Sequence, residues 1–550
     1  MPETIIAAVT YGGYISAVKI IVHLGLFLLW IPLVTWVHND AKMVDTNEAA
    51  WTATVLGTGA AALLIWQFIP IFLIGLALYV LAVGTAALAY VRHRNARVMD
   101  FDRVLTVEHI KSLLSRSDDK LAAMKSFTFI TANHNEVPLP EPRTPDFFGY
   151  RMAYELFSDA EWRRAESIIF TPTAEDYKVT YYVDGVAAKQ PSIEKEHIKF
   201  IIHFLKNIAD LDLKEKRKPQ KGSFALSKDR VVTEWEVTTA GSTVGEQVLI
   251  KRTTAEDIAR VDQIGFMPDQ LEQVKALRSL KQGLFIVSGP AKSGVTTTFY
   301  ALLRNHDAFI NSINTLETRP TAEVPNITQN VFNPAEAGTS TYAEKLAQMI
   351  RMGPDIVGIT DCKDTESAQL ACKAAADGKI VYIVLEADSV IQALGRWLKL
   401  AKDRNLVADT LVGISNQRLL RKLCNECKQA YAPNKGVFKK FNINAEKTKV
   451  LYRAGKVIYD KHGKPSDCED CQAIGYVGRT GVFETVFLND QLREVVRNAK
   501  SLPEISSNFR RARMLYLQEQ ALRKVIAGVT DINEMIRAIS ATKQKTKPSK

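Results

Sequence analysis

Cysteine is scarce in this sequence, with six among 550 residues, and charge is missing from one long stretch. Four of the cysteines form two C-x-x-C pairs, which in a chain with a cytosolic-looking body favour metal binding over disulfides. No charged residue occurs between Thr52 and Tyr90. No basic stripe interleaved with aromatic residues occurs either, so the net charge of +11 does not by itself indicate a nucleic-acid partner. We expect none and keep a nucleic-acid-binding membrane protein only as an alternative.

Composition excludes global disorder. Hydrophobic residues make up 47% of the chain and charged residues 24%, which is enough apolar material for a large core. A chain of 550 residues predicts three or four domains. The pI of about 9.1 is compatible with contact to anionic lipid.

Two apolar segments near the N-terminus are typical of membrane spans. Val18 to Val37 is nearly uninterrupted, and Thr52 to Tyr90 is long enough for two spans. About 20 helical residues cross a hydrocarbon core of ~30 Å. A break near Gln67 or Pro70 therefore predicts three transmembrane helices in all. A signal peptide would explain the first segment but not the second, and a buried soluble hairpin is the other alternative.

A basic cluster, Arg92 to Arg97, follows the last predicted span directly. By the positive-inside rule it places the remaining chain in the cytoplasm. With three spans the N-terminus then lies outside. We therefore expect a multi-pass protein of the inner (cytoplasmic) membrane with a large cytoplasmic body.

A small α/β domain is predicted after the anchor. Phe101 to Ser126 has helical spacing, and the proline-rich stretch from Asn133 to Asp146 predicts an extended linker. Lys214 to Gly222 is either a solvated charge run or a positioned loop, and the resemblance given below favours the loop. The domain's other predicted elements are a hairpin at Tyr177 to Gly185, an amphipathic helix at Ile193 to Leu211, and strands at Val231 to Val237 and Glu246 to Lys251.

A phosphate-binding loop is predicted between a buried strand at Leu284 to Val287 and a helix at Thr296 to Leu303. The pattern G-x-x-x-x-G-K-[ST] is met except at its lysine, where Val295 stands. Lys292 is either a substitute cation or a plain solvent-exposed loop lysine. The candidate nucleotide-binding residues are Gly289, Lys292, Ser293, Gly294, Val295, Thr296 and Thr297.

The two C-x-x-C pairs supply four thiolates, the ligand set of a closed tetrahedral zinc site. A structural zinc ion is expected, with reduced core cysteines as the alternative. Cys362 and Cys372 lack partners at ligand spacing and are expected to be buried small hydrophobic residues. The four candidate ligands are Cys424, Cys427, Cys468 and Cys471.

With these motifs in hand, the chain from about Tyr177 to about Glu534 resembles the secretion ATPases of type II secretion and type IV pilus assembly. The most specific match is Cys471 to Glu484, which joins the second C-x-x-C to a Gly-Tyr-x-Gly-Arg turn. Other matches are Tyr182 to Gly185, Glu215 to Gly222, Gly283 to Tyr300, Pro354 to Asp361 and Gln417 to Cys424. The three N-terminal spans are an addition to this pattern.

The resemblance implies catalytic roles that this chain fills poorly. Val295 replaces the Walker A lysine, Thr296 keeps the Mg²⁺-binding hydroxyl, and Asp361 replaces the catalytic glutamate of Walker B. Only Glu317 survives of the acidic box, and Arg351 aligns with an arginine expected ahead of Walker B. Further departures are Lys379 and Glu386 in place of two histidines, and Ala347, Glu236 and Gln247 in place of arginines.

Because phosphoryl transfer depends on positioned cations and an oriented water, losing several of these groups together predicts a pseudo-ATPase. The predicted fold is α/β: a RecA-like P-loop core, a small α/β N-terminal domain, a zinc-knuckle insertion, a helical C-terminal part and three N-terminal transmembrane helices. ATP with Mg²⁺ would bind weakly or not at all.

The predicted role is a scaffold or regulator of a secretion or pilus-like assembly. Its expected partners are the membrane, other assembly proteins and an intact paralogous ATPase, in a homo- or hetero-hexamer. An active or weakly active motor using Lys292, Asp361 and Arg351 is the alternative. The predicted domains are 1–97 (anchor), 98–150 (helix and linker), 151–255 (N-terminal domain), 256–490 (P-loop domain with the metal motif 424–471) and 491–550 (C-terminal helices and basic tail).

Overall fold

A computed structural model describes residues 17–44, 46–69, 71–97, 103–106, 127–141, 144–228, 231–253, 258–336, 338, 340–444, 446, 448–455, 457–459 and 465–544. Contacts divide the chain into two compact units, which we describe one at a time. The first unit contains the N-terminal helices, β1 (Phe127–Ile130) and the first half of α6 (Pro145–Trp162); the second contains nearly all of the rest.

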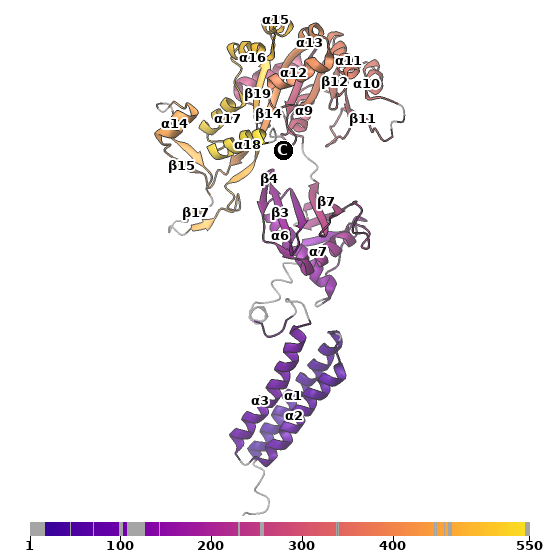
Figure 1. Cartoon of the computed structure of the whole chain (residues 1–550), viewed down its shortest axis with the longest axis vertical. Helices are drawn as coiled ribbons and strands as arrows, with labels where there is room; N and C mark the ends of the chain where they lie inside the picture. The colour runs from indigo at the N-terminus through magenta and orange to yellow at the C-terminus, as the bar shows by residue number, and fades with distance from the viewer. Residues whose placement is uncertain are drawn as a thin grey trace, which may run out of the picture. The chain divides into compact units, whose positions relative to one another are not determined.

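Three long helices lie side by side at the start of the first unit (Figure 1). They are α1 (Ala17–Met43), α2 (Glu48–Phe68) and α3 (Phe72–Asn95). Each is long and apolar enough to cross a membrane. The break that the sequence predicts near Gln67 or Pro70 falls between α2 and α3, so the expectation of three membrane-length helices is confirmed.

The three helices pack through small residues against large ones and through one buried polar cluster. A Cβ atom at Gly59 would lie 2.3 Å from Trp30, and one at Gly75 would lie 1.7 Å from Trp66, so both close approaches require glycine. Near the C-terminal ends of α1 and α3, the Asp40 carboxylate accepts hydrogen bonds from Arg94 Nε and the Tyr90 hydroxyl, both at 2.7 Å. This buried ion pair joins α1 to α3.

The segment after the helices departs from the expected helix and linker. Of the helix predicted at Phe101 to Ser126, only residues 103–106 are described, and they are not helical. The linker predicted at Asn133 to Asp146 contains Glu136, which forms a β-bridge to Ile130 in β1. α6 runs through residue 150, so the predicted domain boundary there falls inside a helix. The rest of the domain division stays a prediction.

A sheet covered by α7 and by the second half of α6, where Phe157 packs on Phe224 and Trp235, opens the second unit. Its strands there run in the order β6-β7-β8-β2-β3-β4, and β5 pairs with β3. The predicted hairpin is present, with Asp184 and Gly185 at positive φ in its turn, as are the amphipathic helix and both later strands. The elements are β2 (Ser167–Pro172), β3 (Asp176–Val183), β4 (Val186–Lys189), β5 (Ile193–Glu194), α7 (Lys195–Ile208), β6 (Gln220–Lys228), β7 (Val231–Gly241) and β8 (Glu246–Thr253).

The P-loop domain is built on a seven-stranded sheet in the order β11-β10-β12-β13-β9-β14-β19. All pairs are parallel except β14 with β19, which is antiparallel. The strands are β9 (Gly283–Gly289), β10 (Ile313–Glu317), β11 (Thr328–Val331), β12 (Ile356–Ile359), β13 (Ile380–Glu386), β14 (Leu411–Leu423) and β19 (Tyr476–Phe487).

Helices cover both faces of this sheet, which explains why its strands are apolar on both sides. Leu284 and Ile286 of β9 face one core, while Phe285 and Val287 face the other. The helices are α8 (Pro268–Ala276) and α9 (Val295–Leu303) on one face, and α10 (Tyr342–Arg351), α11 (Thr365–Ala376), α12 (Val390–Ala401) and α13 (Arg404–Thr410) on the other.

The C-terminal part adds a small insertion between β14 and β19 and then four helices, as the sequence predicts. The insertion contains β15 (Gln429–Tyr431), α14 (Lys435–Phe441), β16 (Leu451–Arg453), β17 (Val457–Tyr459) and β18 (Pro465–Asp467). The helices are α15 (Asp490–Asn498), α16 (Leu502–Arg511), α17 (Leu517–Ile526) and α18 (Ile532–Gln544). Of the predicted basic tail, residues 545–550 lie outside the described residues.

Candidate functional site: a phosphate-binding loop without its lysine

The loop between β9 and α9 has the backbone of a phosphate-binding loop. Gly294 adopts a left-handed conformation (φ 82°, ψ 17°) immediately before the helix and supplies no capping side chain. The first N–H groups of α9, at Val295, Thr296 and Thr297, therefore have no acceptor within the helix. They can bind an anion, as helix N-termini do.

The interior of the loop is tightly filled. A Cβ atom at Gly289 would lie 2.2 Å from Ser293 Oγ and 2.9 Å from Val295 Cγ2, so only glycine fits there. Ser293 Oγ and Gln417 Oε1 are both buried and have no hydrogen-bond partner among the described residues. The Gln417 amide donates to the Ser293 carbonyl at 2.9 Å, which ties the loop to β14.

Val295 occupies the position of the missing lysine and points its side chain into the protein. It is half-buried and packs against the apolar cluster that contains Phe299 and Val287. An isopropyl group in this place can neither donate to a phosphate nor neutralise one. The loop therefore keeps its backbone donors and lacks its own cation.

Lys292 is the nearest lysine in the loop, and it is exposed. Its backbone has a positive φ of 64°, which is unfavourable for any residue with a Cβ atom. Its ammonium lies 5.9 Å from the centre of the Tyr182 ring. Lys292 and Ser293 line a cavity of about 300 Å³ next to the loop. The Lys292 ammonium is therefore at the edge of this cavity and not in the interior of the loop.

Arginines that are distant in sequence line the same cavity, among them Arg418, Arg421 and Arg537. These three are already paired with carboxylates. Arg418 pairs with Asp388 at 3.2 Å, and Arg421 pairs with Glu534 at 2.9 Å. Arg537 pairs with the same Glu534 carboxylate. Their charges are therefore partly neutralised before any ligand arrives.

The buried Glu534 carboxylate gives this region a specific pH dependence. Burial alone would raise its pKa, but hydrogen bonds from Arg537 and Arg421 outweigh burial and lower the pKa to about 2 from an ordinary 4.5. Since the folded-state pKa is depressed, its contribution to stability is complete above about pH 4.5 and is lost as pH falls toward 2.

We predict that the full chain loses up to about 3 kcal/mol of unfolding free energy through Glu534 over this window. Urea unfolding of the native chain and of Glu534→Gln between pH 6 and 2.5 measures the difference. The variant is less stable at pH 6 and has a flatter acid slope. Equal slopes in the two proteins would contradict the assignment.

Glu317, the surviving residue of the predicted acidic box, is buried at the end of β10 and is 1% exposed. Its carboxylate accepts hydrogen bonds from the Tyr300 hydroxyl at 2.6 Å, the Thr315 hydroxyl at 2.7 Å and the Gln329 amide at 3.1 Å. Burial, followed by the bond to Glu317, raises the pKa of Tyr300 to about 12. These contacts join three elements around Glu317, so its role in this structure is to hold them together.

We predict that Glu317→Ala lowers the unfolding free energy by about 3 kcal/mol, because two buried hydroxyl donors and one partly buried amide donor lose their acceptor. Chemical denaturation of the full chain tests this, with Glu323→Ala, which removes an exposed carboxylate from the following loop, as the matched control. A cost below about 0.5 kcal/mol, the range of ordinary surface substitutions, would show that Glu317 is not structural.

Neither Asp361 nor Arg351 lines the cavity next to the loop. Asp361 follows β12, next to the end of β10. Burial would raise its pKa, but hydrogen bonds from Thr318 and Thr360, together with Lys363, lower it. Lys363 Nζ lies 3.4 Å from the carboxylate. Arg351, at the end of α10, is exposed and lines a different cavity together with residues of α10 and β11.

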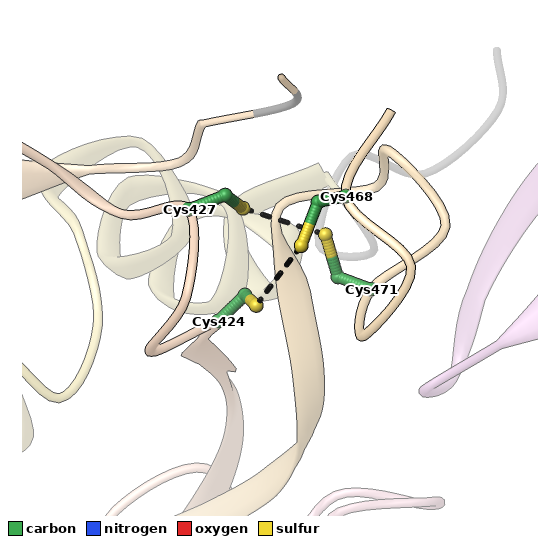
Figure 2. Close-up of side chains that lie close together, drawn as sticks. All are labelled: Cys424, Cys427, Cys468 and Cys471. Atoms are coloured by element: carbon green, nitrogen blue, oxygen red, sulfur yellow. Dashed lines mark hydrogen bonds between the residues drawn. The ribbon is translucent and has the colours of Figure 1, made fainter. Parts of the chain in front are cut away.

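The four predicted metal ligands come together at one point. All four are buried, and their Sγ atoms lie within 4.8 Å of one another. Figure 2 shows the side chains of Cys424 and Cys427 facing those of Cys468 and Cys471. The first pair follows β14 and the second precedes β19. The Sγ atoms of Cys424 and Cys468 are 3.8 Å apart, and those of Cys427 and Cys471 are 3.4 Å apart. Cys362 and Cys372 are buried separately within an apolar cluster, as predicted.

This geometry fits a metal ion. Four sulfurs at ~2.3 Å from a tetrahedral zinc lie about 3.8 Å apart. Burial raises the pKa of Cys424 and Cys427, so holding them as thiolates requires a bound cation. The Gly475 N–H donates to Cys471 Sγ at 3.2 Å, an arrangement that favours a thiolate. The four cysteines can therefore bind a metal ion.

The sheet order, the loop after β9 and the cysteine cluster together define a P-loop protein with the secretion-ATPase fold. The chain belongs to the family of type II/IV secretion system proteins, whose family model matches residues 149–537. The match begins inside α6, so α1, α2 and α3 lie outside it.

Relatives support the same assignment. The chain is 26% identical over 435 residues to "Type IV pilus assembly ATPase PilB" of Thermus thermophilus, covering 79% of this chain and 48% of that protein. It is 29% identical over 389 residues to "Type II secretion system protein E" of Dickeya dadantii, covering 70% and 75%. The chain thus spans about half the length of the Thermus relative.

A solved structure shares the fold. The X-ray structure of the Legionella pneumophila ATPase DotB aligns with a TM-score of 0.50 at 14% sequence identity, covering 73% of this chain and 98% of that one. At this identity the likeness concerns the fold alone.

Sequence reasoning missed the part of the site that β14 supplies. Gln417 and Arg418 appear in a matched motif, but nothing in their spacing places them beside the loop. Parallel pairing of β14 with β9 does so, with Asn416 opposite Ser288. The only available signal was the polar run Ser415 to Arg418 in the middle of the strand, between apolar residues.

Proposed function

We propose that this chain is a membrane-anchored, catalytically degenerate member of the secretion ATPase family. It serves as a scaffold or regulator of a type II secretion or type IV pilus-like assembly and docks against an intact paralogous ATPase in a hexameric ring. The observation that carries the proposal is Val295, whose half-buried side chain packs against an apolar cluster at the position of the cation of the phosphate-binding loop.

The positions of the other predicted catalytic residues support this proposal. Glu317 is held by three donors in the core, Arg351 lines a separate cavity, and Asp361 is paired with Lys363. Phosphoryl transfer needs positive charge and an oriented water at the terminal phosphate. These residues supply neither at the loop.

The charge distribution along α1, α2 and α3 supports an anchor with the body in the cytoplasm. Asp40, Glu48 and Arg94 all lie at the same end of the bundle, because α1 and α3 finish there and α2 starts there. The following basic residues make that end the cytoplasmic one. The body is then attached to the inner face of the cytoplasmic membrane and the N-terminus lies outside.

Zinc in the four-cysteine site completes the proposal. A closed Cys₄ site without an open position is structural. The chain's own residues hold the ends of β14 and β19 together there, while a bound zinc supplies the cross-link. A maintained fold beside an eroded nucleotide site is what a scaffold requires.

A weakly active motor is the second candidate, supported by the position of Lys292 on the loop's cavity. The two are separated by ATP turnover of the full chain in detergent, measured beside an intact relative. The scaffold proposal expects no turnover above background. Turnover that Lys292→Ala abolishes while the fold survives would replace it with the motor.

A further inference from the structure

The basic loop, residues 214–221, presents an unusual concentration of positive charge between α7 and β6. It contains five cations and one carboxylate. Lys221 pairs with Glu236 at 2.8 Å. The other four cations are exposed and form no ion pair with any carboxylate in the described part of the chain: Lys214, Lys216, Arg217 and Lys218.

A buried ion pair holds the backbone of the basic loop in place. Lys206 of α7 is 2% exposed, and its ammonium lies 2.6 Å from the carboxylate of Glu246 in β8. The same ammonium donates to the backbone carbonyl of Glu215 at 2.6 Å. A buried charge in the core of this domain therefore anchors the middle of the basic loop.

The loop's own carboxylate is used internally. Glu215 accepts hydrogen bonds from the backbone N–H groups of Arg217 at 2.7 Å and Lys218 at 3.0 Å. These donors, Lys218 first, hold the pKa of Glu215 below its usual value. Gln220 adds bonds to the carbonyls of Asp212 and Glu215. The negative charge thus shapes the turn, and the cations face solvent.

Neighbouring backbone supports the loop from the side. The Gly241 N–H donates to the Arg217 carbonyl at 3.1 Å, and a Cβ atom at Gly241 would lie 2.6 Å from Arg217 Cα. The four unpaired cations therefore stand on a fixed turn, and Leu213 beside them is 38% exposed. A flexible charge run would show none of these contacts.

The membrane anchor brings the basic loop close to a negatively charged surface. From Asn95 at the end of α3 to Phe127 in β1, the polypeptide can reach at most about 110 Å, whatever its conformation. The body of an anchored chain is thus confined near the membrane. Anionic headgroups attract clusters of Lys and Arg close to a membrane span, and an exposed leucine adds apolar contact.

We propose that the basic loop binds the anionic phospholipid headgroups of the membrane that α1, α2 and α3 span, and so orients the cytoplasmic body on that membrane. The inference rests on the proposed membrane anchoring and is independent of whether the chain hydrolyses ATP.

The test uses the full chain in lipid nanodiscs of phosphatidylcholine alone or with phosphatidylglycerol. An amine-acetylating reagent labels exposed lysines, and mass spectrometry gives the rate at each one. We expect the rates at Lys214, Lys216 and Lys218 to fall about fivefold or more in anionic discs at low salt and to recover at high salt. Lys275 in the last turn of α8 and Lys281 just beyond that helix are both exposed, and as the internal control they keep their rates.

Two variants that each lose three positive charges, one set in the basic loop and one elsewhere, test whether the loop's own charges cause the protection. Lys221, at the end of the basic loop, is also expected to be labelled more slowly in anionic discs, and it remains available as a probe when its neighbours are replaced. Lys214→Gln, Lys216→Gln and Lys218→Gln together should abolish this protection of Lys221. Lys275→Gln, Arg278→Gln and Lys281→Gln, an equal loss of charge elsewhere, should leave it intact.

Equal rates in the two lipids would overturn the proposal, as would a fall shared by the control lysines. Protection seen only when the same labelling is done in native membranes, and not in the discs that contain phosphatidylglycerol, would assign the loop to an acidic protein instead. A chain that fails to enter discs at all would refute the anchoring itself, which separates the two failures.

Discussion

Cys424→Ser is expected to release the metal ion and to lower the unfolding free energy by more than about 4 kcal/mol, the range in which loss of a metal falls. The four sulfurs form a separate buried cluster after the end of β14 and ahead of β19, and they converge within 4.8 Å. In the variant, three thiols and one hydroxyl remain, burial raises the pKa of Cys427, and no metal ion cross-links the two pairs. The cost is therefore larger than that of losing one small apolar side chain.

Metal content by elemental analysis and thermal unfolding of the full chain measure both effects. Native protein should hold about one zinc per chain at this single Cys₄ site. Cys372→Ala, which removes a buried cysteine elsewhere in the same domain, is the matched control and should keep the metal. If the native chain holds no metal and the two variants cost the same stability, the four cysteines are ordinary core residues.

Val295→Lys is expected to raise the affinity for an Mg²⁺-bound, non-hydrolysable ATP analogue by about tenfold to over a hundredfold, since a charged hydrogen bond is worth ~1.5–3 kcal/mol. The backbone donors at the start of α9 and the hydroxyl of Thr296 are already in place. The aliphatic part of the introduced lysine must extend past the apolar cluster against which Val295 packs, so that its ammonium reaches the loop.

Calorimetric titration of the full chain gives the affinities. Val295→Met, which has a similar length but no charge, should bind no better than the native protein. Hydrolysis should stay at background in Val295→Lys, because Glu317, Asp361 and Arg351 are unchanged. A native chain that already binds and cleaves ATP efficiently would refute both this prediction and the pseudo-ATPase proposal.

Features that are compact in sequence were predictable. The strand, turn and helix around Gly289 to Leu303 lie within twenty residues, so glycine spacing and apolar runs reveal them. Each C-x-x-C pair is a local chelate, and the apolar helices can be recognised from the length of their apolar segments. The hairpin at Asp184 and Gly185 follows from residues that tolerate positive φ.

Features that depend on long-range pairing were not predictable. Glu317 appears in sequence as the remnant of an acidic box, and only its neighbours Tyr300, Thr315 and Gln329 reveal a structural role. The bridge from Glu136 to Ile130 likewise turned part of an expected linker into paired backbone.

The sequence by itself determined that the chain has three membrane-length helices, a phosphate-binding loop lacking its lysine and two metal-chelating pairs, because each is encoded by neighbouring residues. Only the tertiary structure decided that Val295 packs against an apolar cluster, that Arg351 lines another cavity and that Lys206 donates a hydrogen bond to the backbone of the basic loop. Those outcomes depend on which strands and helices pair across hundreds of residues, and spacing along the chain carries no record of that choice.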